Sequence, residues 1–143
     1  GIGSKVLWME EQELTGKIIG CAMRVHSVLG PGFLESVYLR ALVHELGKAG
    51  LRIECQKRLT VHYDGIVVGE FSADMVVEDR VLLELKANHV LAPVNEVQLV
   101  HYLTATGIEV GLLLNFGGKR LEFRRKTRTY RPNRVPAADC DSE

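Results

Sequence analysis

The sequence contains few cysteines, no long apolar run and no excess charge of either sign. Its three cysteines, Cys21, Cys55 and Cys140, form neither a disulfide framework nor a CxxC zinc pattern, and they are typical of a protein of the reducing cytoplasm. The longest apolar runs, such as residues 111–116, are far shorter than the about 20 residues of a membrane-spanning helix, so we expect no membrane partner. A length of 143 residues, of which 46% are hydrophobic and 25% charged, predicts one globular domain and excludes a disordered chain.

The motifs of several enzyme classes are also missing. The five histidines have no HxxxH or HExxH spacing and lie on separate predicted elements, so they form no metal-binding set. The sequence contains no GxGxxG motif, no glycine-rich phosphate loop and no Ser/His/Asp order. A site must therefore be sought among the acidic, basic and amide side chains.

Basic residues are concentrated near the end of the chain. Residues 119–134 contain eight of the 18 lysines and arginines and one acidic residue, Glu122, although the formal net charge of the whole chain is zero. Such a segment is typical either of a surface that binds a polyanion or of a solvated tail, and its composition alone does not choose between them.

Hydrophobic periodicity predicts a chain that mixes helices and strands. Apolar residues first recur at helical spacing, with Gly30-Pro31-Gly32 between two helices, and the period then changes to two. Asp64-Gly65 is a hairpin signal between the first two strands. The pattern predicts helices over 10–29, 33–48 and 94–106, and strands over 52–63, 66–77, 81–87, 110–116 and 120–126. This order is that of a single α/β domain whose mixed β-sheet is flanked by helices.

The two strands on either side of Asp79 carry the predicted chemistry. With the turn centred on this residue, Asp74 lies opposite Glu84 and Ser72 lies opposite Lys86, with opposed Cβ atoms about 5 Å apart. Two opposed carboxylates among apolar neighbours repel each other, so either one is protonated or a cation lies between them. A hard divalent ion such as Mg²⁺ binds one or two carboxylates together with water and substrate oxygens, and this pair offers that arrangement.

The same residues have a simpler interpretation. An isolated Glu-x-Lys sequence is more often a pair of surface charges on an exposed strand, and a slip of one residue would turn one carboxylate to the opposite face. The strand that carries Glu84 and Lys86 is nevertheless apolar at residues 81–83 and at Leu85, which indicates burial on both faces. A buried charge needs a partner, and this requirement favours a site.

Two helices supply further polar groups. Glu35 lies near the start of the second predicted helix, where an acidic residue is often only a partner of the helix dipole. Gln98 and Tyr102 are four residues apart and share a face of the third helix, where such a pair is more often packing and surface than a site.

In combination these residues resemble a known family. Residues 32–38 match the GxxExxY motif that names a family of small proteins, and further matches follow in that family's order. These matches are Asp74, the Glu84-Leu85-Lys86 triplet, Gln98 with Tyr102, and residues 111–116. The family is placed in the PD-(D/E)XK nuclease superfamily, so the resemblance implies a restriction-endonuclease-like core of helix, three strands, helix and strand (α-β-β-β-α-β). We expect the nuclease-like domain over 10–126, an N-terminal extension over 1–9 and a polar, initially basic tail over 127–143.

The resemblance also implies a metal centre. Asp74 and Glu84 would bind the catalytic Mg²⁺ or Mn²⁺ with the main-chain carbonyl of Leu85, and Lys86 would orient or activate water or stabilise the transition state. Ala73 stands where the superfamily's name has proline. The remaining implied site residues act around this centre: Glu35 as a further ligand, directly or through water, and Gln98 with Tyr102 in positioning the site and the nucleic acid.

The implied function is a metal-dependent nuclease that hydrolyses phosphodiester bonds, in DNA more than in RNA. Basic residues would hold the phosphate backbone through salt-dependent contacts. They are Lys119, Arg120, Arg124, Arg125, Lys126 and Arg128. Superfamily members that cut both strands often act as dimers, so a homodimer is expected. Two alternatives stay open: a non-catalytic nucleic-acid-binding module with the nuclease fold, and an accessory subunit of a repair or defence complex.

Overall fold

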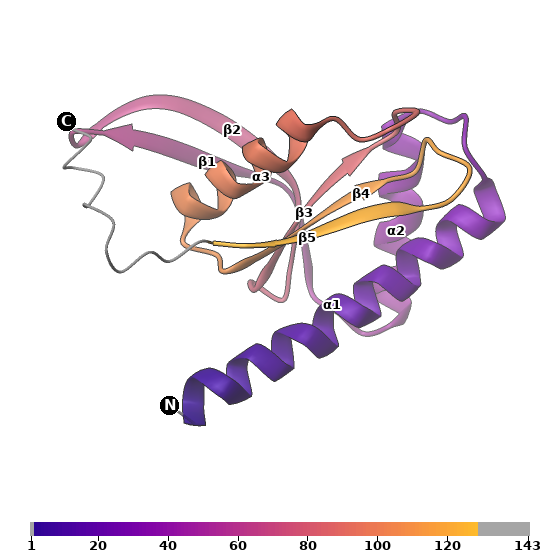
Figure 1. Cartoon of the computed structure of the whole chain (residues 1–143), viewed down its shortest axis with the longest axis horizontal. Helices are drawn as coiled ribbons and strands as arrows, with labels where there is room; N and C mark the ends of the chain where they lie inside the picture. Colours follow the sequence, from indigo (N-terminus) through magenta and orange to yellow (C-terminus); the bar gives the residue numbers. More distant parts are fainter. Residues whose placement is uncertain (1, 129–143) are drawn as a thin grey trace.

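The computed structural model describes residues 2–128 and contains the eight predicted elements in the predicted order (Figure 1). They are α1 (Ile2–Leu29), α2 (Glu35–Lys48), β1 (Ile53–Tyr63), β2 (Ile66–Val77), β3 (Val81–Lys86), α3 (Pro93–Thr106), β4 (Val110–Asn115) and β5 (Glu122–Thr127). The main difference lies at the start, because α1 begins at Ile2 and not near residue 10. Arg131, Arg134 and Cys140 lie outside the described residues. Among the helices of residues 2–128, none combines the length and the apolar character needed to cross a membrane.

The five strands form one mixed sheet in the order β1-β2-β3-β4-β5. β3 and β4 are parallel, and the other neighbours are antiparallel. Because parallel neighbours need a crossover, α3 connects β3 to β4. The predicted single α/β domain with helices flanking a mixed sheet is therefore confirmed.

Helices cover the two faces of the sheet unequally. α1 and α2 pack on one face over the larger core, which takes Leu83 and Leu85 from β3. α3 packs on the other face over a smaller core, which takes Leu82 from the same strand. Every residue of β3 before Lys86 is buried, as the apolar composition of this strand predicted. The side chain of Glu84 alternates with Leu83 and Leu85 and so belongs to the α3 face.

The link between α1 and α2 explains the Gly and Tyr of the GxxExxY match. Gly32 has a φ of 116°, a conformation that side-chain-bearing residues rarely adopt. The Tyr38 hydroxyl donates to the Gly30 carbonyl (2.5 Å) and accepts from the Phe33 N–H (3.1 Å). The buried Tyr38 ring stacks on Phe116, with ring centroids 4.8 Å apart. This tyrosine therefore holds the link that leads into α2.

β2 pairs with β3 over only a short stretch. The pairs Val77–Val81, Val76–Leu82 and Met75–Leu83 follow the register predicted from a turn centred on Asp79. Beyond them β2 stays paired with β1 alone, and the two strands continue past β3 as a hairpin arm, here defined as residues 57–73 (Figure 1). The predicted pairing of Ser72 with Lys86 is therefore wrong, because the ladder ends before it.

The base of this arm is irregular. Ala73 and Val76 both belong to the small core under α3, although strict alternation would place them on opposite faces. The pair that would join Gln56 to Asp74 is absent from the β1–β2 ladder, and Gln56 has a φ of 52°. A non-glycine residue with positive φ is uncommon, and here it marks the point where β2 leaves the regular sheet.

Candidate metal centre

Asp74 and Glu84 meet where β2 separates from β3. The Asp74 N–H donates to Glu84 Oε2 (3.2 Å), and the Leu85 N–H donates to Asp74 Oδ2 (2.8 Å). Each carboxylate thus accepts from a main-chain N–H. In a continuous strand ladder, that N–H would have donated to a main-chain carbonyl of the neighbouring strand. The structure brings together the two carboxylates that the sequence register placed opposite each other.

Burial and mutual repulsion disfavour two negative charges here. Glu84 is only 8% exposed, and burial, with the Asp74 charge second, raises its pKa to about 8. Burial likewise raises the pKa of Asp74, against the opposing effects of the Leu85 N–H and of Lys86. The ammonium of Lys86 also lowers the pKa of Glu84 without cancelling the rise. A cation at the pair would offset the cost of burying two negative charges, which is the main cause of both shifts.

The raised pKa of Glu84 predicts that the metal-free protein loses stability as the pH rises. The folded state holds the Glu84 proton up to about pH 8, whereas the unfolded chain releases it near 4.5, so stability falls between these values. The full shift corresponds to roughly 5 kcal/mol. Asp74, also shifted upward, acts in the same direction. We expect urea unfolding in the presence of a chelator to show this decline for the parent and a flatter profile for Glu84→Gln; parallel profiles would contradict the prediction.

The two carboxyl groups hydrogen-bond each other, and their oxygens suit a hard divalent ion. Asp74 Oδ1 and Glu84 Oε1 accept no N–H within residues 2–128. The Leu85 N–H points toward β2, so in an extended strand its own carbonyl points the same way. Two carboxylates and one carbonyl fit an ion that completes its shell with water and substrate oxygens. Within the described residues, no group of three or more His, Cys, Asp or Glu side chains could hold a metal.

Glu35 and Lys86 approach the pair from different elements. Lys86 is the last residue of β3. It pairs with Asn115 of β4, and its carbonyl accepts from the Phe116 N–H (2.8 Å). Glu35 is exposed in the first turn of α2. Its charge adds a small upward contribution to the pKa of Glu84, after burial and the Asp74 charge. The structure therefore places Glu35 within electrostatic reach of the pair but outside any direct three-carboxylate cluster.

Of the two predicted α3 residues, Tyr102 lies within electrostatic reach of the pair. The Tyr102 ring stacks on Phe71 of β2, with ring centroids 3.9 Å apart and planes 11° apart. Burial, then the charges of Glu84 and Asp74, raise the pKa of the Tyr102 hydroxyl. Gln98 is exposed and makes no side-chain hydrogen bond within residues 2–128. Phe71 was not predicted as a site residue, because strict alternation places it on the opposite face of the strand from Asp74.

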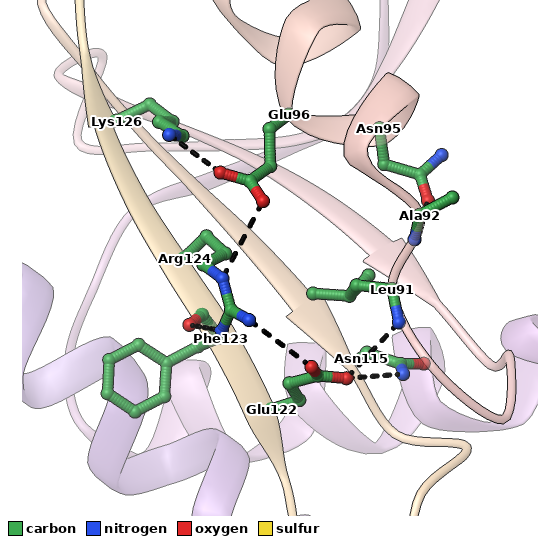
Figure 2. A network of polar contacts seen from close by, with 9 residues as sticks. All are labelled: Leu91, Ala92, Asn95, Glu96, Asn115, Glu122, Phe123, Arg124 and Lys126. Atoms are coloured by element: carbon green, nitrogen blue, oxygen red, sulfur yellow. Dashed lines mark hydrogen bonds and ion pairs between the residues drawn. The ribbon is translucent and has the colours of Figure 1, made fainter.

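A buried amide braces the loop that follows Lys86. Asn115 is fully buried, and its Oδ1 accepts from the N–H groups of Asn88 (2.9 Å) and Gly117 (3.2 Å). Its Nδ2 donates to Glu122 Oε1 (3.2 Å), which also accepts from the Leu91 N–H (3.3 Å) (Figure 2). Asn115 was not predicted as a site residue. In the sequence, Asn115 is a single amide within the apolar run 111–116. Because a buried polar group needs hydrogen-bond partners, this amide could have indicated a structural role.

The basic strip is less free than its composition indicated. Glu96 on α3 pairs with Arg124 (3.6 Å) and with Lys126 (2.6 Å), as Figure 2 shows. Arg128 pairs with Glu109. Three of the six residues predicted to contact phosphate are therefore already paired with carboxylates that lie far from them in the sequence.

The other three basic residues, Lys119, Arg120 and Arg125, lie on different parts of the structure. Lys119 and Arg120 are exposed in the turn after β4. Because β4 is parallel to β3 and pairs Asn115 with Lys86, this turn lies at the same end of the sheet as Lys86. Arg125 is half-buried, and its Nε and Nη2 have no hydrogen-bond partner in the described part of the chain.

Comparisons with known proteins agree with this architecture. A family model described as the PD-(D/E)XK nuclease superfamily matches residues 12–126, and the chain belongs to this superfamily. The restriction-endonuclease-like fold predicted from the sequence is thereby confirmed.

One solved structure gives a more distant likeness. The protein described as "Crystal structure of SSO0001" aligns with a TM-score of 0.53 and 17% sequence identity, over 67% of this chain and 50% of that chain. At this identity the likeness concerns the fold alone, and the present chain spans half the length of that protein. Comparison with curated proteins gives no match.

Proposed function

We propose that this protein is a metal-dependent nuclease that hydrolyses phosphodiester bonds in nucleic acid, with DNA as the preferred substrate. The observation that carries the proposal is the contact between half-buried Asp74 and buried Glu84, with Lys86 at the end of the strand that carries Glu84. Membership of the nuclease superfamily supports it. The proposal places the active domain in residues 10–126 and the protein in the cytoplasm.

The proposed roles follow from position. Asp74, Glu84 and the Leu85 carbonyl hold Mg²⁺ or Mn²⁺, which when bound polarises a phosphoryl oxygen and lowers the pKa of a water ligand. Lys86 meets the negative charge that develops on the phosphate, or orients the attacking water. Glu35 acts through water, because it lies outside the direct cluster.

The nucleic acid is proposed to approach the end of the sheet where β3 and β4 finish. Lys119 and Arg120 are exposed at this end and supply the first phosphate contacts. Arg124 and Lys126 join them only by leaving Glu96, so their contribution to affinity is reduced by the lost ion pairs. A homodimer, included in this proposal, would supply a second site for the second strand of a duplex.

Metal binding and cleavage test the proposal together. Calorimetric titration of Mg²⁺ and Mn²⁺ should give binding to the parent that Glu84→Ala loses, because one of the two carboxylates is removed. The parent should cut labelled DNA in Mg²⁺ and stop when a chelator is added, and parallel RNA substrates measure the preference. Nucleic-acid binding without cleavage in either metal would contradict the proposal and favour the non-catalytic module; co-purification with a fixed partner would favour the accessory subunit.

A further inference from the structure

A pocket lies between the hairpin arm and α3. Its volume is about 550 Å³, which falls within the range of small-molecule sites. Its wall on the arm includes Thr60 and His62 from β1 and Phe71 from β2, and its wall on the helix includes His101, Tyr102 and Ala105. The pocket exists because β1 and β2 continue past the end of their pairing with β3 while α3 packs beside them (Figure 1).

Tyr102 links the pocket to the carboxylate pair. Its ring lines the pocket and stacks on Phe71, and its hydroxyl is within electrostatic reach of Glu84 and Asp74. Phe71 and Asp74 are three residues apart on β2, a rise of about 10 Å along the strand. A nucleic acid strand held at the metal centre could therefore reach the pocket within its next nucleotides.

The lining selects the chemistry of the occupant. It combines aromatic rings, imidazoles and threonine hydroxyls, and contains no Lys, Arg, Asp or Glu. Such a lining offers stacking surfaces together with hydrogen-bond donors and acceptors for the edge of a base. It offers no fixed positive charge for a phosphate, in contrast to the turn that carries Lys119 and Arg120.

We propose that this pocket binds an unpaired nucleobase of the substrate strand, beside the phosphate held at the Asp74–Glu84 pair. The inference rests on the proposed function for the identity of the strand. An unpaired base must leave its stack to enter, so the pocket favours single-stranded or frayed nucleic acid over an intact duplex.

Filling the pocket tests the proposal. Ala105→Trp places a large ring in it, and binding of a labelled single-stranded oligothymidine is measured by fluorescence anisotropy with a chelator present. Loss of one base–aromatic contact should weaken this binding about 5- to 150-fold, with little change for a duplex of equal length. Val61→Trp fills the pocket from the arm and serves if Ala105→Trp does not fold, because Val61 lines the pocket on the same strand face as Leu59, which packs under α3. Met23→Trp, at a half-exposed position of α1 on the other face of the sheet, is the control and should bind as the parent does.

The outcomes separate this inference from the proposed function. Equal single-strand affinity for the parent and both pocket variants, or equal losses for single strand and duplex, would overturn the base pocket even if the parent cuts DNA. A selective loss of single-strand affinity would support the pocket even if the parent cuts no substrate in Mg²⁺ or Mn²⁺, which would instead count against the nuclease. Failure of the parent to bind single strands would also overturn the pocket.

Discussion

Replacement of Lys86 by methionine should reduce cleavage about 10²- to 10⁴-fold and leave the carboxylate pair in place. The main chain of Lys86 is fixed by its pairing with Asn115 and by the bond from the Phe116 N–H, so methionine removes the charge and little else. The ammonium is the cation closest in sequence to the pair, and its charge lowers the pKa of both carboxyls, against the larger upward effect of burial. Single-turnover cleavage at saturating Mg²⁺ measures the effect on the chemical step.

Two measurements make this prediction specific. Calorimetry should still detect metal binding to Lys86→Met at least as tight as in the parent, because both carboxylates stay in place and a neighbouring positive charge that opposes a cation is lost. Lys17→Met, on the exposed surface of α1, should cut at the parent's rate. Cleavage by Lys86→Met within a few-fold of the parent would show that the lysine has no part in the reaction.

Replacement of Gly117 by alanine should destabilise the fold by about 3 kcal/mol and lower the melting temperature by roughly 10 °C. A Cβ at Gly117 would lie 2.2 Å from the Asn88 carbonyl oxygen and 2.5 Å from the Ala87 carbonyl carbon. Both are main-chain atoms of the loop directly after Lys86, and that loop is held by Asn115. It cannot move aside without breaking those bonds.

The neighbouring glycine supplies the control for this prediction. A Cβ at Gly118 would lie 3.4 Å from the carbonyl oxygens of His89 and Arg120, an ordinary contact, and Gly118 has no positive φ. Gly118→Ala should therefore unfold close to the parent in urea and on heating. Equal unfolding midpoints for the two alanine variants would show that the loop after β3 is easily displaced. This result would contradict the inference that Asn115 holds the loop in place.

Much of the fold could be read from local signals. Asp64-Gly65 and the Gly30-Pro31-Gly32 break marked two connections correctly, and the turn around Asp79 gave the register of Val76 with Leu82. The early departure of β2 from β3 could not be predicted in this way. It depends on a positive φ at Gln56 and on the packing of Ala73 under α3, which are properties of the folded molecule.

The residues of the site also divide into those that local signals predict and those that depend on the folded structure. Asp74 and Glu84 came from strand register, and Tyr102 came from helical spacing and the family resemblance. Phe71 was hidden because the alternation of β2 changes between Ala73 and Val76. The ion pairs of the basic strip were not predictable, because Glu96 lies on α3 and Glu109 in the loop before β4. Charge counted along a sequence contains no information about such pairing.

The hairpin arm has a consequence for the motions of the molecule. Among residues 2–128, the strands of this arm hydrogen-bond in the sheet only to each other, and they rest on α3 through a small core. A segment supported in this way can open as a separate cooperative unit at a lower free energy than global unfolding, while the larger core under α1 and α2 stays intact. The hinge of that opening falls at Gln56 and Asp74, so a ligand that bridges Asp74 to β3 would also restrain the arm.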